Sequence, residues 1–112
     1  MFHQSDNINF KMAGVTMVES TIYIRNKTGL HLKPATELSQ LCDRMDSDIK
    51  IIFGNKHLNP KSVLMLVGAE IKQGSKILIQ VEGPNEAEDL KTIEDAINGG
   101  FGEEMIPLDE IV

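Results

Sequence analysis

Cysteine is almost absent from the chain, since Cys42 is the single one among 112 residues. An internal disulfide framework and a CxxC metal site are therefore excluded, and one thiol suits a reducing compartment. No apolar run approaches the roughly 20 residues that a transmembrane helix requires. Residues 1–13 are polar and lack the apolar stretch of a secretory signal. We therefore expect a cytoplasmic protein that does not insert into a membrane.

Basic residues are also few, with 11 Lys and Arg against 17 Asp and Glu, for a net charge of −6. This acidic balance argues against general nucleic-acid binding. The histidines His3, His31 and His57 are scattered without a partner at ligand spacing, so we expect no metal site and no cofactor. His57 is expected on a strand surface, and Cys42 as a small buried hydrophobe. The length predicts one domain.

Apolar and polar residues alternate in four short stretches, which is the period of a half-buried strand. The predicted strands are 20–25, 49–53, 56–58 and 76–82. Gly54 and Asn55 separate the second from the third, and glycine in the first position favours a type II′ hairpin turn. Residues 1–18 show no clear period, so we expect them to form a disordered extension.

Three other stretches have the period of an amphipathic helix. In 32–44 the apolar positions include Ala35, Leu38 and Cys42, and the last helix ends at Gly99-Gly100. Ser62 opens a short middle helix, where its hydroxyl is expected to cap the N-terminus. The predicted order is β-α-β-β-α-β-α, an α+β fold, and this pattern alone leaves a ferredoxin-like arrangement open.

The segment 28–35 joins the first strand to the first helix. Gly29 permits a sharp turn because it adopts positive φ without steric penalty, and Pro34 is tolerated only in the first turn of a helix. His31 is thereby predicted at a helix N-terminus, with Lys33 two residues later. Free backbone N–H groups and the helix dipole attract anions there, and phosphate is a natural occupant. This arrangement suggests a histidine that carries a phosphoryl group.

The same segment carries a family resemblance. Gly-Leu-His-Leu-Lys-Pro-Ala at 29–35 resembles the active-site signature of HPr, the histidine-containing phosphocarrier of the sugar phosphotransferase system. Lys-Ser-Val-Leu at 61–64 resembles the second signature of the family, and the ending at 98–101 is also similar. The resemblance implies an open-faced β-sandwich, a four-stranded antiparallel sheet with three helices on one face. It divides the chain into an extension (1–18), an HPr-like domain (19–103) and a tail (104–112).

The resemblance also implies a function. A phosphoryl group from phosphoenolpyruvate would pass through enzyme I to Nδ1 of His31, and then to an enzyme IIA-type sugar transport component. The protein would be a monomeric carrier and not an enzyme. Lys33 stands where the family usually has arginine, and it would stabilise the phosphate as a point charge without the bidentate geometry of arginine.

The resemblance also has implications for regulation and docking. Ser62 corresponds to a serine that an HPr-type serine kinase phosphorylates in some members, and the alternative interpretation is a simple N-cap. Leu64 and Met65 resemble an exposed apolar docking patch, although Met65 and Glu70 stand where related chains often have glycine.

Three alternatives remain open from the sequence. Asn26-Lys27 and Gly100-Phe101 resemble the paralogue of the nitrogen-related phosphotransfer branch. A regulatory binding module that relays no phosphate is a second alternative, against which the presence of His31 argues. A ferredoxin-like metabolite- or metal-binding domain is the third, with only its element order in favour.

Overall fold

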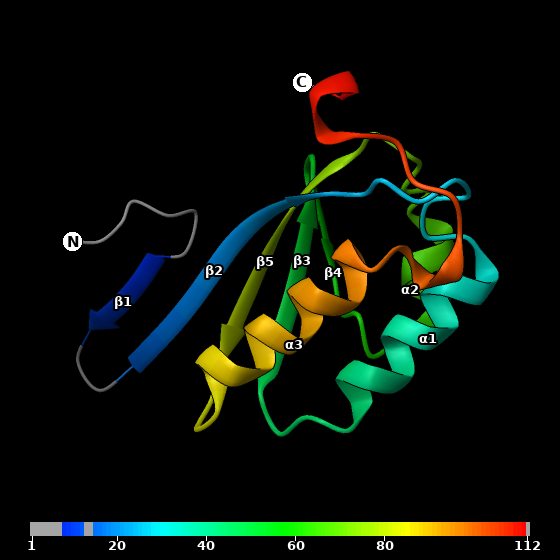
Figure 1. Ribbon diagram of the computed structural model, residues 1–112. Coiled ribbons are helices and arrows are strands. Elements are labelled where there is room, and N and C mark those ends of the chain that lie inside the picture. Colours follow the sequence, from blue (N-terminus) through cyan, green and yellow to red (C-terminus); the bar gives the residue numbers. More distant parts are fainter. Residues whose placement is uncertain (1–7, 13–14, 112) are drawn as a thin grey trace.

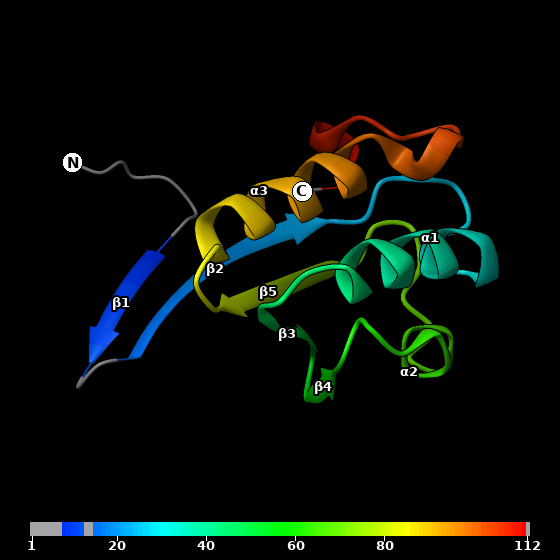
Figure 2. The same ribbon diagram turned by 90° about the horizontal axis from the view of Figure 1, so that it is seen from below.

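The computed structural model describes residues 8–12 and 15–111, arranged as one antiparallel sheet with helices on one face (Figures 1 and 2). The strands are β1 (Ile8–Met12), β2 (Val15–Tyr23), β3 (Asp48–Phe53), β4 (Lys56–Leu58) and β5 (Lys76–Glu82). The helices are α1 (Leu32–Asp43), α2 (Val63–Gly68) and α3 (Glu86–Asn98), followed by the short 3-10 helices η1 (Gly100–Gly102) and η2 (Leu108–Glu110).

The order of strands in the sheet is β1-β2-β5-β3-β4, and each neighbouring pair is antiparallel. The last strand along the chain, β5, therefore lies between β2 and β3. This arrangement, with α1, α2 and α3 over one face, confirms the predicted α+β open-faced fold. The described part of the chain contains no helix long and apolar enough to span a membrane.

The core lies between the sheet and the helices. Strand β5 shows the expected alternation, because Ile77, Ile79 and Val81 are buried while the residues between them are partly exposed. Helices α1 and α3 bury Leu38, Cys42 and Ile93 against this face. Cys42 is fully buried, which confirms the prediction of a buried hydrophobe, and this burial raises the pKa of its thiol to about 12.

The N-terminal region differs from the sequence expectation. Strand β1 makes a fifth strand, and β2 begins at Val15, so residues 8–12 and 15–18 are not the disordered extension that we expected. Their backbones pair in antiparallel register from Ile8 opposite Glu19 to Met12 opposite Val15. Pairing along the edge of β2 satisfies backbone N–H and C=O groups and does not require alternating apolar residues. The alternation of apolar residues therefore did not predict β1. The rest of that expectation, residues 1–7 and 13–14, lies outside the described residues.

Local turn predictions agree with the structure. Gly54 has a φ of 62°, whereas Asn55 is not among the described non-glycine residues with positive φ, which are Glu70 and Phe101. A positive φ at the first central position alone is typical of the predicted type II′ turn. His57, which follows in β4, is exposed as expected.

Candidate functional site

The turn from β2 to α1 is held by close backbone packing. Gly29 has a φ of 66°, and a Cβ atom added there would lie 2.3 Å from the carbonyl oxygen of Ile71. The next residue, Leu30, is 1% exposed and donates its backbone N–H to the same oxygen at 2.9 Å. Only glycine fits at position 29, and the buried Leu30 side chain fixes the start of the segment that carries His31.

His31 is the N-cap of α1. Its backbone is extended (φ −71°, ψ −177°), its carbonyl oxygen accepts the N–H of Ala35 at 2.8 Å, and its side chain is exposed and makes no capping hydrogen bond. Among the described residues, the N–H groups of Leu32 and Lys33 have no hydrogen-bond acceptor, and Pro34 has no N–H group. The predicted location is confirmed: an accessible imidazole stands beside two open backbone donors.

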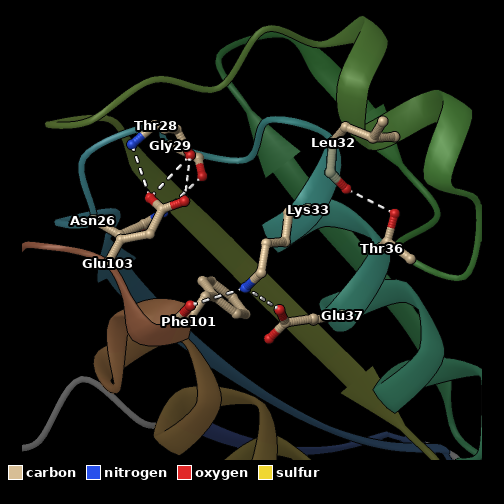
Figure 3. Close-up of polar contacts among 9 residues, drawn as sticks. All are labelled: Asn26, Thr28, Gly29, Leu32, Lys33, Thr36, Glu37, Phe101 and Glu103. Carbon is tan, nitrogen blue, oxygen red and sulfur yellow. Dashed lines mark hydrogen bonds and ion pairs between the residues drawn. The ribbon is translucent and has the colours of Figure 1, made fainter.

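Lys33 is directed toward the body of the protein. Its Nζ atom lies 2.7 Å from Oε2 of Glu37 and 3.5 Å from the carbonyl oxygen of Phe101 (Figure 3). The hydrogen bond and charge of Glu37 raise the pKa of Lys33, to which the more distant charge of Glu103 adds. Lys33 and Glu37 are one helical turn apart, and their side chains are 71% and 45% exposed, so water screens the pair.

Glu103 is a member of the site that sequence reasoning missed. Its carboxylate accepts the backbone N–H of Thr28 at 2.9 Å, the hydroxyl of the same residue, and the side-chain amide of Asn26 at 3.0 Å (Figure 3). These hydrogen bonds lower the pKa of Glu103. No sequence period links residues 75 positions apart, so only the fold brings this acid to the turn.

Ser62 caps helix α2, as predicted. Its Oγ atom accepts the backbone N–H of Met65 at 3.2 Å. The neighbouring Lys61 reaches away from it, because its ammonium group donates to the carbonyl oxygens of Met45 and Ser47 at 2.9 and 3.0 Å. The cap is therefore established, whereas phosphorylation of Ser62 stays a prediction.

Large apolar side chains are exposed on α1 and α2, two helices that pack against each other. Leu64 is 84% exposed and Met65 is 42% exposed, which fits the predicted docking surface. Leu32, which directly follows His31, is 58% exposed and was not among the predicted docking residues. An exposed leucine therefore also stands directly beside the histidine.

Comparisons with known proteins agree with the geometry around His31. A family model described as the PTS HPr component phosphorylation site matches residues 18–99. The chain belongs to the HPr family. The phosphocarrier protein HPr of Treponema pallidum (strain Nichols) is 33% identical over 88 residues, which cover 79% of this chain and 100% of that protein. The phosphocarrier protein HPr of Neisseria meningitidis is 31% identical over 87 residues, covering 78% and 98%.

Solved HPr structures share the fold. HPr-C-His from Thermoanaerobacter tengcongensis superposes with a TM-score of 0.74 at 38% identity, covering 78% of this chain and 98% of that one. The structure shows the surroundings of two residues, Glu70 and Lys33, that depart from the usual HPr sequence. Glu70 has a φ of 56°, a conformation that explains why related chains often have glycine at this place. Lys33 has an ionic partner on its own helix, as described above.

Within the described residues no group of three or more histidine, cysteine or acidic side chains is placed to hold a metal ion. The site combines one histidine, open backbone donors and the ammonium group of Lys33, which is an arrangement suited to binding an oxyanion.

Proposed function

We propose that this HPr-family protein carries a phosphoryl group on Nδ1 of His31, between enzyme I and an enzyme IIA-type sugar transport component. The observation that supports this most is the exposed His31 imidazole at the N-terminus of α1, next to the open N–H groups of Leu32 and Lys33. An oxyanion attached to the ring would find both hydrogen-bond donors and the positive end of a helix dipole.

The chemistry needs little beyond this geometry. The lone pair of Nδ1 would attack the phosphorus atom of the phosphorylated donor, so that a new N–P bond forms as the bond between phosphorus and the donor breaks. In the second step the acceptor attacks the same phosphorus atom, and the imidazole leaves with its electron pair. The partner enzymes would supply alignment and electrostatic stabilisation. On this proposal the protein is a carrier and not an enzyme, and it requires no cofactor.

Lys33 would assist as a point charge. To reach the phosphoryl group, its ammonium group would leave Glu37, and the exposure of both side chains makes that exchange inexpensive. Leu64, Met65 and the neighbouring Leu32 would form the apolar contact with both partners, since burying exposed apolar area drives association. The protein would act as a monomer in the cytoplasm.

Ser62 is a candidate site of regulation, which an HPr-type serine kinase would phosphorylate. A phosphate there would add negative charge beside the proposed docking residues Leu64 and Met65, which alters how an acidic partner approaches. Incubation with such a kinase and ATP, followed by intact mass measurement, tests this. A gain of one phosphate in the wild type and none in Ser62→Ala supports it, whereas an unchanged wild-type mass removes it.

The nitrogen-related branch is the second candidate function, and it rests on the resemblance of Asn26-Lys27 and Gly100-Phe101 to that branch. The two pairs lie in neighbouring segments, because Asn26 donates to Glu103 and Lys27 donates its N–H to the carbonyl of Glu104, two and three residues after Phe101. Transfer assays with both kinds of acceptor separate the two branches. A regulatory module without phosphate relay would show no transfer to either.

Phosphorylation with enzyme I and phosphoenolpyruvate tests the relay directly. We expect one acid-labile phosphate on the wild type and none on His31→Ala. His57→Ala is the matched control, since His57 is also exposed but lies on β4 away from a helix N-terminus. An unphosphorylated wild type, or a phosphate that persists in His31→Ala, would overturn the proposal.

A further inference from the structure

The C-terminal segment is attached to the strand-to-helix turn by its backbone. Lys27 donates its N–H to the carbonyl of Glu104 at 2.8 Å, and the N–H of Ile106 donates to the carbonyl of Arg25 at 3.0 Å. Between these two hydrogen bonds, Asn26 and Met105 form an isolated antiparallel bridge. Residues 103–106 therefore run alongside 25–28, and Glu103 is delivered beside Thr28 by main-chain contacts.

The path into this segment is unusual. Gly100 has a φ of 75°, and a Cβ atom there would lie 2.3 Å from Sδ of Met105. Phe101 follows with a φ of 55°, in the left-handed region that a non-glycine residue enters at a cost. Three consecutive residues with positive φ, of which Gly102 (φ 80°) is the last, turn the chain from the end of α3 back toward the strand-to-helix turn. Such a conformation persists only where the surrounding contacts hold it.

Asn26 connects Glu103 to the residues before His31. It is fully buried, and the two protons of its side-chain amide go to Oε1 of Glu103 and to the carbonyl of Gly29 at 2.8 Å. Its Oδ1 atom is buried without a hydrogen-bond partner in the described part of the chain. The side-chain amide of Asn26 therefore makes both of its donor hydrogen bonds while its oxygen makes none, which indicates that the fold depends on the two donor contacts. Glu103, Asn26 and Gly29 thus form a continuous hydrogen-bonded path that ends two residues before His31.

We propose that Glu103 is a positioning residue for phosphoryl transfer, which acts by holding the turn 26–29 so that His31 and the open amides of α1 keep a fixed relation. This inference rests on the proposed function of His31. Glu103 itself would touch neither the phosphoryl group nor the imidazole. Its negative charge is already used by three donors on Asn26 and Thr28, so it does not compete with the phosphate for the amides of Leu32 and Lys33.

The alternative is that Glu103 only adds stability to the fold. A purely structural role predicts that Glu103 variants lose thermal stability but transfer phosphate normally while folded. Positioning predicts a lower kcat with little change in the KM for this protein as substrate of enzyme I, because two of the three proposed docking residues, Leu64 and Met65, lie on α2 and not in the turn that Glu103 contacts.

The experiment compares Glu103→Ala and Glu103→Gln with Glu104→Ala in the full chain. Glu104 is the matched control, since it is the adjacent acid and its hydrogen bond to Lys27 is made by its backbone. We expect kcat to fall about three- to tenfold in Glu103→Ala and less in Glu103→Gln, which keeps one oxygen acceptor, with Glu104→Ala equal to wild type. The proposal is overturned if both Glu103 variants have the kcat of the wild type, or if Glu103→Gln has a higher kcat than the wild type.

A second readout does not depend on transfer. Amide hydrogen exchange of residues 28–33 and the ¹⁵N shifts of the His31 ring report the turn directly in the unphosphorylated protein. We expect faster exchange and shifted ring signals in Glu103→Ala but not in Glu104→Ala; unchanged signals in a folded Glu103 variant overturn the proposal. If Glu103→Ala does not fold, Glu103→Gln and Thr28→Val are used in both measurements. If the wild type accepts no phosphate, the proposed function fails, and the exchange data still decide whether Glu103 holds the turn.

Discussion

Lys33 and Glu37 form an ion pair across one turn of α1, with 2.7 Å between Nζ and Oε2. The Lys33 side chain is largely exposed and the Glu37 side chain is partly exposed, and the same ammonium group is 3.5 Å from the carbonyl oxygen of Phe101. The charge that would assist phosphate at His31 is therefore held by a neighbouring acid when no phosphate is bound. Position 33 is where the chain departs from the arginine that is usual in the family, so its partners bear directly on transfer.

Replacing Lys33 tests the value of this charge. We expect Lys33→Ala to slow phosphoryl transfer more than Lys33→Arg does, because arginine keeps the charge and adds a bidentate geometry. Glu37→Gln releases the lysine and should leave transfer equal to wild type or faster by a few-fold. Rates are measured in a reconstituted relay. Equal rates for Lys33→Ala and Lys33→Arg would show that Lys33 is incidental.

The cap of α2 has a measurable effect on stability. Ser62→Ala removes the acceptor for the Met65 N–H and should lower the free energy of unfolding by about 1 kcal/mol, the usual cost of a lost N-cap. Ser62→Thr keeps a hydroxyl oxygen and should stay close to wild type. Urea unfolding followed by circular dichroism measures both. An alanine variant as stable as wild type would contradict the capping role.

Glu70 occupies a backbone conformation that favours glycine, with a φ of 56°. Glu70→Gly should raise the free energy of unfolding by about 0.5–1 kcal/mol, because relief of the left-handed strain exceeds the entropy that glycine gains in the unfolded chain. Lys72→Gly is the control. Lys72 is exposed and has no positive φ, so glycine at this position should lower the free energy of unfolding. If denaturant melts show both variants to be destabilised, Glu70 is not strained.

Glu103 predicts a pH dependence whose sign follows from its lowered pKa. A carboxylate with a lower pKa in the folded than in the unfolded protein stabilises the fold above the unfolded pKa. That contribution is lost as the pH falls through the folded pKa. The stability difference between wild type and Glu103→Gln should therefore be present at neutral pH and vanish at low pH. Lys33 is the charged group that adds to the lowering, so the profile is repeated in Lys33→Ala. A difference that is constant from neutral to acid pH contradicts this assignment.

Cys42 should be unreactive in the folded protein. Its side chain is fully buried, and burial raises the pKa of its thiol to about 12, so the reactive thiolate is scarce even at mildly alkaline pH. Labelling with a thiol reagent at pH 8 should be slow in native protein and fast in guanidinium chloride. Rapid native labelling would show that the helix α1 opens readily.

Local features of this protein are readable in its amino acids alone. Alternating apolar residues determine β3 to β5, a helical period determines α1 and α3, and the spacing of Gly29 and Pro34 determines that His31 opens a helix. These features depend on sterics and periodicity within a few residues, so a neighbouring stretch of sequence contains all the information.

Only the tertiary structure decided the contacts between distant segments. Glu103 meets Thr28 across 75 residues because the left-handed turn after α3 and the main-chain bridge at Met105 bring it there. Strand β1 likewise depends on the backbone edge of β2 and not on its own pattern. Contacts between segments so far apart close long loops, whose entropic cost must be offset by the fold as a whole, and no local period in the sequence encodes them.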